Sequence, residues 1–115
     1  MGKTNSTFLE SYKHKAAKDV LASWLSDDYE VKPEQYFGNG TATFKPDIAT
    51  FTNGFVDAFW EVSHTHEVDG NKLMKMQYYC YSTGQEILCH EVEAEWILRQ
   101  TEKPDKIQKF TYTLI

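Results

Sequence analysis

Asp47 and Glu61 are the two residues whose types and spacing point most directly to chemistry. They lie fourteen positions apart, and the tight-turn signal Asn53-Gly54 falls at the midpoint. A hairpin around this turn would bring both carboxylates onto adjacent strands. If they face each other, their Cα atoms are expected about 4.5 to 5.5 Å apart, and a divalent cation between them is the usual reason to tolerate the repulsion.

The length of the turn decides whether the two carboxylates meet. A three-residue loop around Gly54 places Asp47 opposite Glu61, whereas a two-residue turn shifts the pairing by one and points them to opposite faces. The alternative to a metal site is two carboxylates in solvent, where most acidic residues on strands lie. The sequence leaves both interpretations open.

Histidines and a lysine near these acids form two further candidate sites. On a continuing strand His64 and His66 would share one face at a spacing compatible with zinc, but only two ligands are evident. The simpler expectation is that His66 orients a carboxylate or caps the following helix. His14 and Lys18 are one helical turn apart, so they either lie in solvent or line a cleft that accepts phosphate.

The first element expected to position these residues is a helix. Thr7 and Glu10 have capping-box spacing, which predicts a helix beginning near Phe8 and reaching about Leu25. His14 and Lys18 are expected on the face opposite its apolar stripe, which consists of Leu9, Tyr12, Ala16, Val20 and Trp24.

Strands and a second helix are expected to follow. Aromatic and β-branched residues predict strands over 29–37, 41–51 and 55–63, arranged as an antiparallel meander. Asp69 and Gly84 have the positions of a helix cap and a helix stop, and strands over 87–98 and 110–114 come next. The fold class is therefore α/β (α+β), with an αβββαβ core, a mixed sheet flanked by two helices and an extra C-terminal antiparallel strand.

Size and charge restrict the function. The 115 residues fit a single domain spanning 1–115. The net charge of −5 excludes the broad basic field of non-specific duplex binders, so any nucleic-acid contact must be local or metal-mediated. Cys80 and Cys89 are expected to be reduced thiols, and the absence of a signal-peptide or membrane-spanning pattern leads us to expect a cytoplasmic protein without membrane contact.

Two side-chain patterns have an ordinary structural interpretation. Alternation over the predicted strand 87–98 assigns Glu91, Glu93 and Glu95 to the solvent face of the sheet. Aromatic and methionine side chains of the second helix either stack nucleobases or belong to the core, and the core is expected. These side chains are Met74, Met76, Tyr78, Tyr79 and Tyr81.

The order of these features resembles the competence-protein CoiA-like nucleases, which belong to the PD-(D/E)xK group. The resemblance covers most of residues 12–98, and the residues that carry it are, in chain order, His14 and Lys18, Glu30, Pro46-Asp47, Glu61, Thr65-His66 and Lys72. It implies a restriction-endonuclease-like fold and a metal-dependent phosphodiesterase, an endonuclease that acts on nucleic acid. DNA is expected as the substrate ahead of RNA, although the sequence itself does not distinguish the two.

The same resemblance implies residue roles. Asp47, Glu61 and Glu30 would hold Mg²⁺ or Mn²⁺, which lowers the pKa of a bound water. His14, Lys18 and His66 would contact the substrate. A homodimer is compatible with the size of such proteins, although no interface is recognisable in the sequence.

Ser63 departs from the group's pattern, because a lysine is expected two positions after Glu61. Serine cannot supply the positive charge that stabilises the transition state. Lys72 on the second helix or Lys18 on the first could substitute. The alternative is a catalytically inactive relative that binds a nucleic acid or a protein. A barrel enclosing an apolar ligand would leave the placement of Pro46-Asp47 and Glu61 unexplained.

Overall fold

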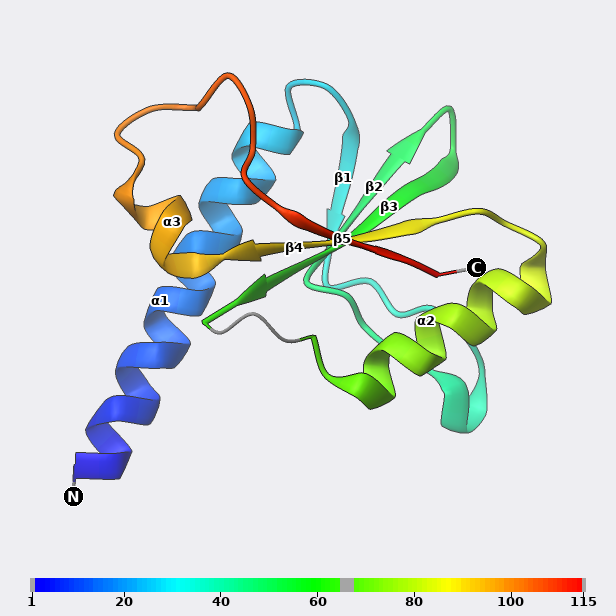
Figure 1. The fold of residues 1–115 in the computed structure, drawn as a ribbon, viewed down its shortest axis with the longest axis horizontal. Coiled ribbons are helices and arrows are strands. Elements are labelled where there is room, and N and C mark those ends of the chain that lie inside the picture. The colour runs from blue at the N-terminus through cyan, green and yellow to red at the C-terminus, as the bar shows by residue number, and fades with distance from the viewer. Residues whose placement is uncertain (1, 65–67, 115) are drawn as a thin grey trace.

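Three helices and a five-stranded sheet make up the structure, a computed structural model (Figure 1). It describes the backbone of residues 2–64 and 68–114, and side chains from residue 11 onward within those ranges. The elements are α1 (Gly2–Leu25), β1 (Glu30–Pro33), the 3₁₀ turn η1 (Gly40–Ala42), β2 (Ile48–Thr52), β3 (Phe55–Ser63), α2 (Gly70–Thr83), β4 (Leu88–Glu93), α3 (Ala94–Arg99) and β5 (Phe110–Thr113).

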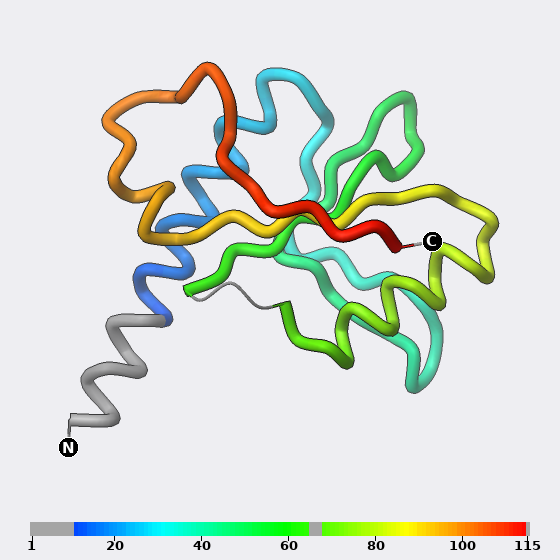
Figure 2. Tube along the Cα trace, in the orientation of Figure 1, coloured from blue at the N-terminus to red at the C-terminus, as the bar shows by residue number. Residues whose placement is uncertain are grey.

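The sheet is mixed, as expected from the sequence. Its spatial order is β1-β2-β3-β4-β5, and every pair is antiparallel except β3 and β4, which are parallel. The α2 helix connects these two parallel strands, as a crossover requires. The trace in Figure 2 ends with β5 beside β4, which confirms the predicted C-terminal antiparallel strand.

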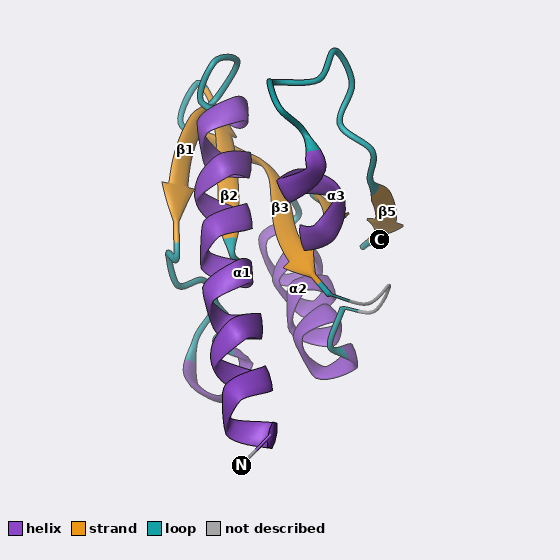
Figure 3. Ribbon diagram, turned by 90° about the vertical axis from the view of Figure 1, so that its left-hand side faces the viewer, coloured by secondary structure: helices purple, strands orange, loops and turns teal. Residues whose placement is uncertain are grey.

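Helices cover both faces of the sheet and create two cores. Figure 3 shows α1 and α3 on one side and α2 on the other. Successive side chains of β3 point alternately into the two cores. Trp60 and Val62 pack toward α1 and α3, whereas Phe59 packs toward α2. Glu61 therefore points to the α2 side. Among the described residues, no helix is long and apolar enough to cross a bilayer.

The β2–β3 hairpin determines the relation between the two candidate carboxylates. Its turn has two residues, Asn53 and Gly54, with φ of 53° and 83°. A β-bulge then corrects the register: Phe51 pairs with Val56 but Thr50 pairs with Ala58, so one residue, Asp57, is extra. Ile48 consequently pairs with Trp60, and the next step of this register sets Asp47 opposite Glu61.

The α1 helix differs from the prediction in its start and its buried face. It begins at Gly2 rather than near Phe8. The buried positions are Ala17, Lys18, Leu21, Trp24 and Leu25. Lys18 therefore faces the sheet rather than solvent, because it has a carboxylate partner there that hydrophobic periodicity does not reveal.

The strand predictions were too long in three places. The strands predicted over 29–37 and 41–51 contract to β1 and β2, and only an antiparallel bridge between Phe37 and Phe44 remains near the Gly38-Asn39-Gly40 turn. The strand predicted over 87–98 ends at Glu93 and is followed by α3, a third helix that was not expected. The sequence AEWILR of α3 is rich in good helix formers, which override the short alternation.

Candidate active site

Asp47 and Glu61 hold each other in place through reciprocal hydrogen bonds. The backbone amide of Asp47 donates to Glu61 Oε2 over 2.8 Å, and the amide of Val62 donates to Asp47 Oδ2 over 2.8 Å. Only 16% of the Asp47 side chain and 10% of the Glu61 side chain are exposed. Two carboxylates are thus fixed together at the end of the hairpin, largely shielded from water.

His14 on α1 is the partner of Asp47. Its Nε2 atom lies 3.2 Å from Asp47 Oδ2. The hydrogen bond with Asp47 raises the pKa of His14 despite partial burial. Burial acts to raise the pKa of Asp47, but the hydrogen bonds from His14 and the Val62 amide outweigh it, so this pKa lies below its usual value. Protonated His14 and ionised Asp47 therefore stabilise each other.

Lys72, in the first turn of α2, is the partner of Glu61. Its Nζ donates to Glu61 Oε1 over 2.7 Å. Burial and the neighbouring Asp47 charge raise the pKa of Glu61, against the opposing effect of Lys72. The two carboxylates therefore have opposite electrostatic character: the pKa of Asp47 is lowered and that of Glu61 is raised.

Glu34, and not the predicted Glu30, is the acidic residue that β1 brings to this end of the sheet. Glu30 pairs with Phe51, four positions beyond Asp47, and its side chain lies 3.7 Å from Lys32. The Glu34 amide donates to the Asp47 carbonyl, and the Glu34 carboxylate accepts a hydrogen bond from Lys18. That bond lowers the pKa of Glu34. Lys18 is thus brought close to the site, but already paired.

Ser63 and Glu91 form a second polar group beside Glu61. Ser63 Oγ donates to Glu91 Oε2 over 2.9 Å, and the Tyr112 hydroxyl donates to Oε1 over 2.8 Å. Glu91 is only 3% exposed, so its prediction on the solvent face was wrong. The parallel pairing of Glu61 with Glu91 explains its position. No feature of the sequence marked Tyr112 as its partner.

A divalent cation would suit the Asp47–Glu61 pair, although the set of ligands is small. Within the described chain, both hydrogen bonds to the Asp47 carboxylate fall on Oδ2, which leaves Oδ1 without a partner. Burial and, after it, the neighbouring Asp47 charge raise the pKa of Glu61, and a cation bound between the two carboxylates would offset both effects. Among the described residues no group of three or more His, Cys, Asp or Glu side chains is arranged to hold a metal.

Comparisons with known proteins leave the family open. No protein-family model and no curated protein matches the chain. Among solved structures it is similar to the crystal structure of a protein called SSO0001, with 16% identity and a TM-score of 0.44. The similarity covers 94% of this chain and 52% of that one, so the chain spans about half the length of that protein.

The histidine pair considered for zinc is only partly described. His64 is exposed, and its ring centroid lies 6.1 Å from that of His14. His66 lies outside the described residues. The role predicted for His66 in orienting a carboxylate or contacting substrate stays a prediction.

The aromatic residues of α2 divide between core and surface, contrary to the expectation that all are buried. Met76 is fully buried and Tyr79 packs against the same core. Met74, Tyr78 and Tyr81 are 66%, 60% and 85% exposed. Their spacing of four and three residues explains this, since it keeps them away from the strip of the helix on which Met76 and Cys80 face the core.

Proposed function

We propose that the protein is a metal-dependent phosphodiesterase, an endonuclease that acts on nucleic acid, with DNA as the preferred substrate. The observation that carries this proposal is the shielded Asp47–Glu61 pair with Lys72 Nζ 2.7 Å from Glu61. Paired carboxylates beside a lysine have the chemistry needed to bind a cation and to offset phosphate charge. The αβββαβ order agrees with the restriction-endonuclease-like fold that the resemblance implies.

Asp47 and Glu61 would hold the Mg²⁺ or Mn²⁺ ion. When bound, such an ion polarises the phosphate and lowers the pKa of a water molecule. The amides of Asp47 and Val62 keep the two carboxylates in position, so little rearrangement is needed for binding. His14 fixes Asp47 from the α1 side and keeps that carboxylate ionised.

Two lysines supply positive charge where the strand has none. Ser63 cannot do so, and its hydroxyl is engaged by Glu91. Lys72 reaches the site from α2, so we assign it the electrostatic role in the reaction. Lys18 and His14 are further candidates for substrate contact. Both project from α1 toward the end of the sheet that carries Asp47 and Glu34, where His14 contacts Asp47 and Lys18 contacts Glu34.

A catalytically inactive binding module is the second candidate, and a specific observation favours it. Both lysines near the site are already neutralised, Lys72 by Glu61 and Lys18 by Glu34. A phosphate would have to compete with these carboxylates. Such a module would recognise a nucleic acid or a protein without cleaving it.

Cleavage assays separate the two functions. Labelled single-stranded DNA, duplex DNA and single-stranded RNA are incubated with the protein in Mg²⁺ or Mn²⁺, alongside Asp47→Asn, Glu61→Gln and Lys72→Ala. The nuclease proposal expects metal-dependent cleavage that falls at least about hundredfold in the carboxylate variants, the size typical for loss of a group that stabilises the transition state. Asp105→Asn, an exposed acid far along the chain, is the matched control. Equal cleavage by wild type and Asp47→Asn would point to a contaminating enzyme.

Metal-dependent melting provides a readout besides activity. A cation that binds only the folded state raises the melting temperature as its concentration increases. Asp47→Asn should abolish that rise, whereas Asp105→Asn should keep it.

We place this activity in the cytoplasm, a reducing compartment in which Cys80 and Cys89 would remain unbridged, as they are in the structure.

A further inference from the structure

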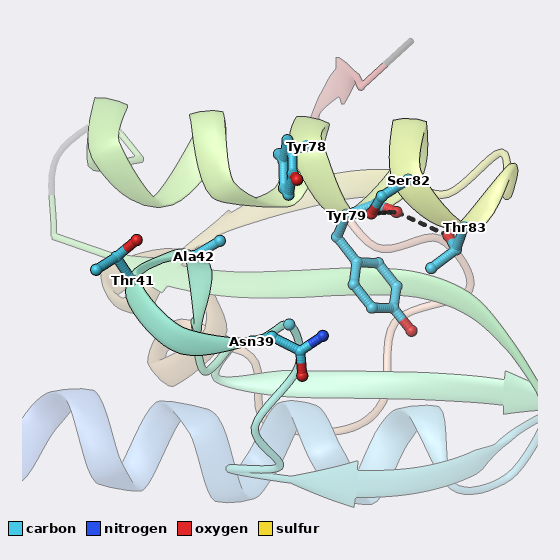
Figure 4. Close-up of a pocket in the computed structure, with 8 residues that line it drawn as sticks. Asn39, Thr41, Ala42, Tyr78, Tyr79, Ser82 and Thr83 are labelled. Carbon is cyan, nitrogen blue, oxygen red and sulfur yellow. Dashed lines mark hydrogen bonds between the residues drawn. The ribbon is translucent and has the colours of Figure 1, made fainter.

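We propose that the cavity between α2 and residues 38–42 binds an unpaired nucleobase, so that the substrate class is single-stranded nucleic acid. The cavity has a volume of about 600 Å³, within the usual range for small-molecule sites. Figure 4 shows Tyr78, Tyr79, Ser82 and Thr83 of α2 facing it from one side and Asn39 from the other. The inference rests on the proposed function for the choice of a nucleic-acid ligand.

One wall of the cavity offers an aromatic surface on a rigid support. Tyr78 lines the cavity and is 60% exposed, so its ring is accessible to a ligand. Its neighbour Tyr79 is held by edge contacts to Phe37, Phe44 and Phe59, with ring centroids 5.6 to 6.1 Å apart. Stacking on tyrosine is the common way in which proteins hold a single base without reading its sequence.

The remaining lining can bond to the edge of a base. Within the described residues, the side chains of Asn39 and Thr41 make no hydrogen bond, so an amide and a hydroxyl are available. The hydroxyls of Ser82 and Thr83 donate to the Tyr79 carbonyl, which leaves their oxygens as acceptors. A nucleobase presents donors and acceptors along its edge and an apolar face, and this cavity matches both features.

The opposite wall is preformed by a tight backbone turn. Gly38 has φ of 84°, and a Cβ there would lie 2.5 Å from the Ala42 carbonyl oxygen. The segment 38–42 is therefore closed on itself and shapes the cavity without a ligand. Preorganisation of this kind lowers the entropic cost of binding.

Charge along α2 connects the cavity with the Asp47–Glu61 pair. The helix contains Lys72 and Lys75 but no acidic residue, in a chain of net charge −5. Lys72, Lys75 and Tyr78 recur every three residues, and Lys72 and Tyr78 are about 9 Å apart along the helix axis. A strand whose base stacks on Tyr78 would thus pass its phosphates along two lysines toward the paired carboxylates.

The choice of a single strand over a duplex follows from this geometry. A base can enter a cavity only when it is not paired and stacked within a helix. Two lysines on one helix are also too few to hold a duplex by its phosphates alone.

Binding measured without divalent cations tests this inference separately from cleavage. Fluorescein-labelled dT12, rU12 and a 12-base-pair duplex are titrated with wild-type protein, Tyr78→Ala and Tyr81→Ala in EDTA, and bound fractions are read from anisotropy. Tyr81 is the matched control, because it lies on the same helix and is exposed but does not line the cavity. Far-UV circular dichroism verifies that both variants are folded.

We expect dT12 or rU12 to bind more tightly than the duplex, and Tyr78→Ala to weaken that binding by between about fivefold and a hundredfold, the range for one stacked base. Tyr81→Ala should bind like wild type. The ratio of dT12 to rU12 affinity assigns the sugar, and Tyr78-dependent binding of either one supports the inference.

Three results would overturn it: no binding of either single strand, equal binding of the duplex, or equal affinities of Tyr78→Ala and wild type. The outcome is independent of the proposed nuclease activity. Tyr78-dependent binding without any cleavage in Mg²⁺ or Mn²⁺ would reject the nuclease and retain the single-strand site. Cleavage that is unaffected by Tyr78→Ala would reject the single-strand site and retain the nuclease.

Discussion

Lys72 Nζ lies 2.7 Å from Glu61 Oε1, although the two residues belong to different layers of the fold. The strand that carries Glu61 has Ser63 where a lysine would be expected, and the following helix places a lysine beside the carboxylate instead. The positive charge at this position therefore depends on how α2 packs against the sheet, and no longer on the sequence of β3.

Removing that charge should change the titration of Glu61. Lys72 lowers the pKa of Glu61 against the raising effects of burial and Asp47. Lys72→Ala should therefore raise this pKa further, and cleavage should fall with it. Carboxyl ¹³C shifts followed from pH 3 to 9 measure the midpoint directly. Lys75→Ala serves as the control for the titration, since Lys75 is on the same helix and no hydrogen bond or ion pair joins it to Glu61. An unchanged Glu61 midpoint in Lys72→Ala would show that the ion pair is not formed in solution.

The His14–Asp47 pair should make stability depend on pH in a defined window. The raised pKa of His14 contributes stability below its unfolded value of about 6.5, and this is lost as pH rises through the folded pKa. The lowered pKa of Asp47 contributes stability above about 3.8, which is lost as pH falls through its folded pKa. The pair therefore stabilises most between these limits.

His14→Gln tests this window by urea unfolding at pH 5.5 and pH 8.5. We expect it to cost about 1 kcal/mol at pH 5.5, the size of one partly exposed charge-assisted hydrogen bond, and less at pH 8.5. A cost that does not vary with pH would mean that His14 acts by packing rather than by charge.

Gly38 and Gly54 have nearly equal φ angles but different surroundings. Substituting each by alanine therefore distinguishes the cost of the left-handed backbone conformation from the cost of a steric clash. Gly38 has φ of 84° and Gly54 has φ of 83°, but a Cβ at Gly54 would meet nothing within 4 Å. Gly54→Ala should cost only the left-handed conformation, about 1 to 2 kcal/mol. Gly38→Ala should cost more, because the added carbon would lie 2.5 Å from Ala42 O. Thermal unfolding of both variants compares them, and equal losses would contradict the tight turn.

Both cysteine thiols should be unreactive toward thiol reagents in the native protein. Cys80 and Cys89 are fully buried, and burial raises the pKa of the Cys89 thiol to about 12. We expect almost no reaction with a thiol-specific disulfide reagent under native conditions and two thiols per chain in denaturant. Rapid native labelling of one thiol would show that the core around α2 opens more readily than its packing indicates.

The sequence predicted the element order well but the boundaries poorly. The meander, the α2 crossover and the antiparallel final strand follow from alternation and from the Asp69 and Gly84 signals, and all are present. The α3 helix was missed because its first residues, Ala94 to Trp96, continue the alternating pattern of β4. The helix propensity of this segment is reinforced by packing of Ala94 and Ile97 against α1, a contact that hydrophobic alternation does not reveal.

The candidate site was predictable only in part. The carboxylate pair and Lys72 came from spacing and from the resemblance. His14 and Lys18 were assigned to the wrong face of α1, because periodicity treats ionisable residues as solvent-facing when their partners lie 16 to 33 positions away. Glu34 was missed for a related reason: the backbone turns at that residue, with φ of 55°, and this redirects the chain after β1.

Because of the extra residue Asp57, the number of residues in the hairpin determines whether Asp47 and Glu61 lie on the same face of the sheet. A two-residue turn without the bulge would assign Asp47 and Glu61 to opposite layers, and the single inserted position restores them to one side. An odd change in the length of this hairpin would therefore separate the acids whatever residues it contained, whereas an even change would leave them together. Besides its turn glycine and its core side chains, this region must therefore preserve the number of residues between the two acids.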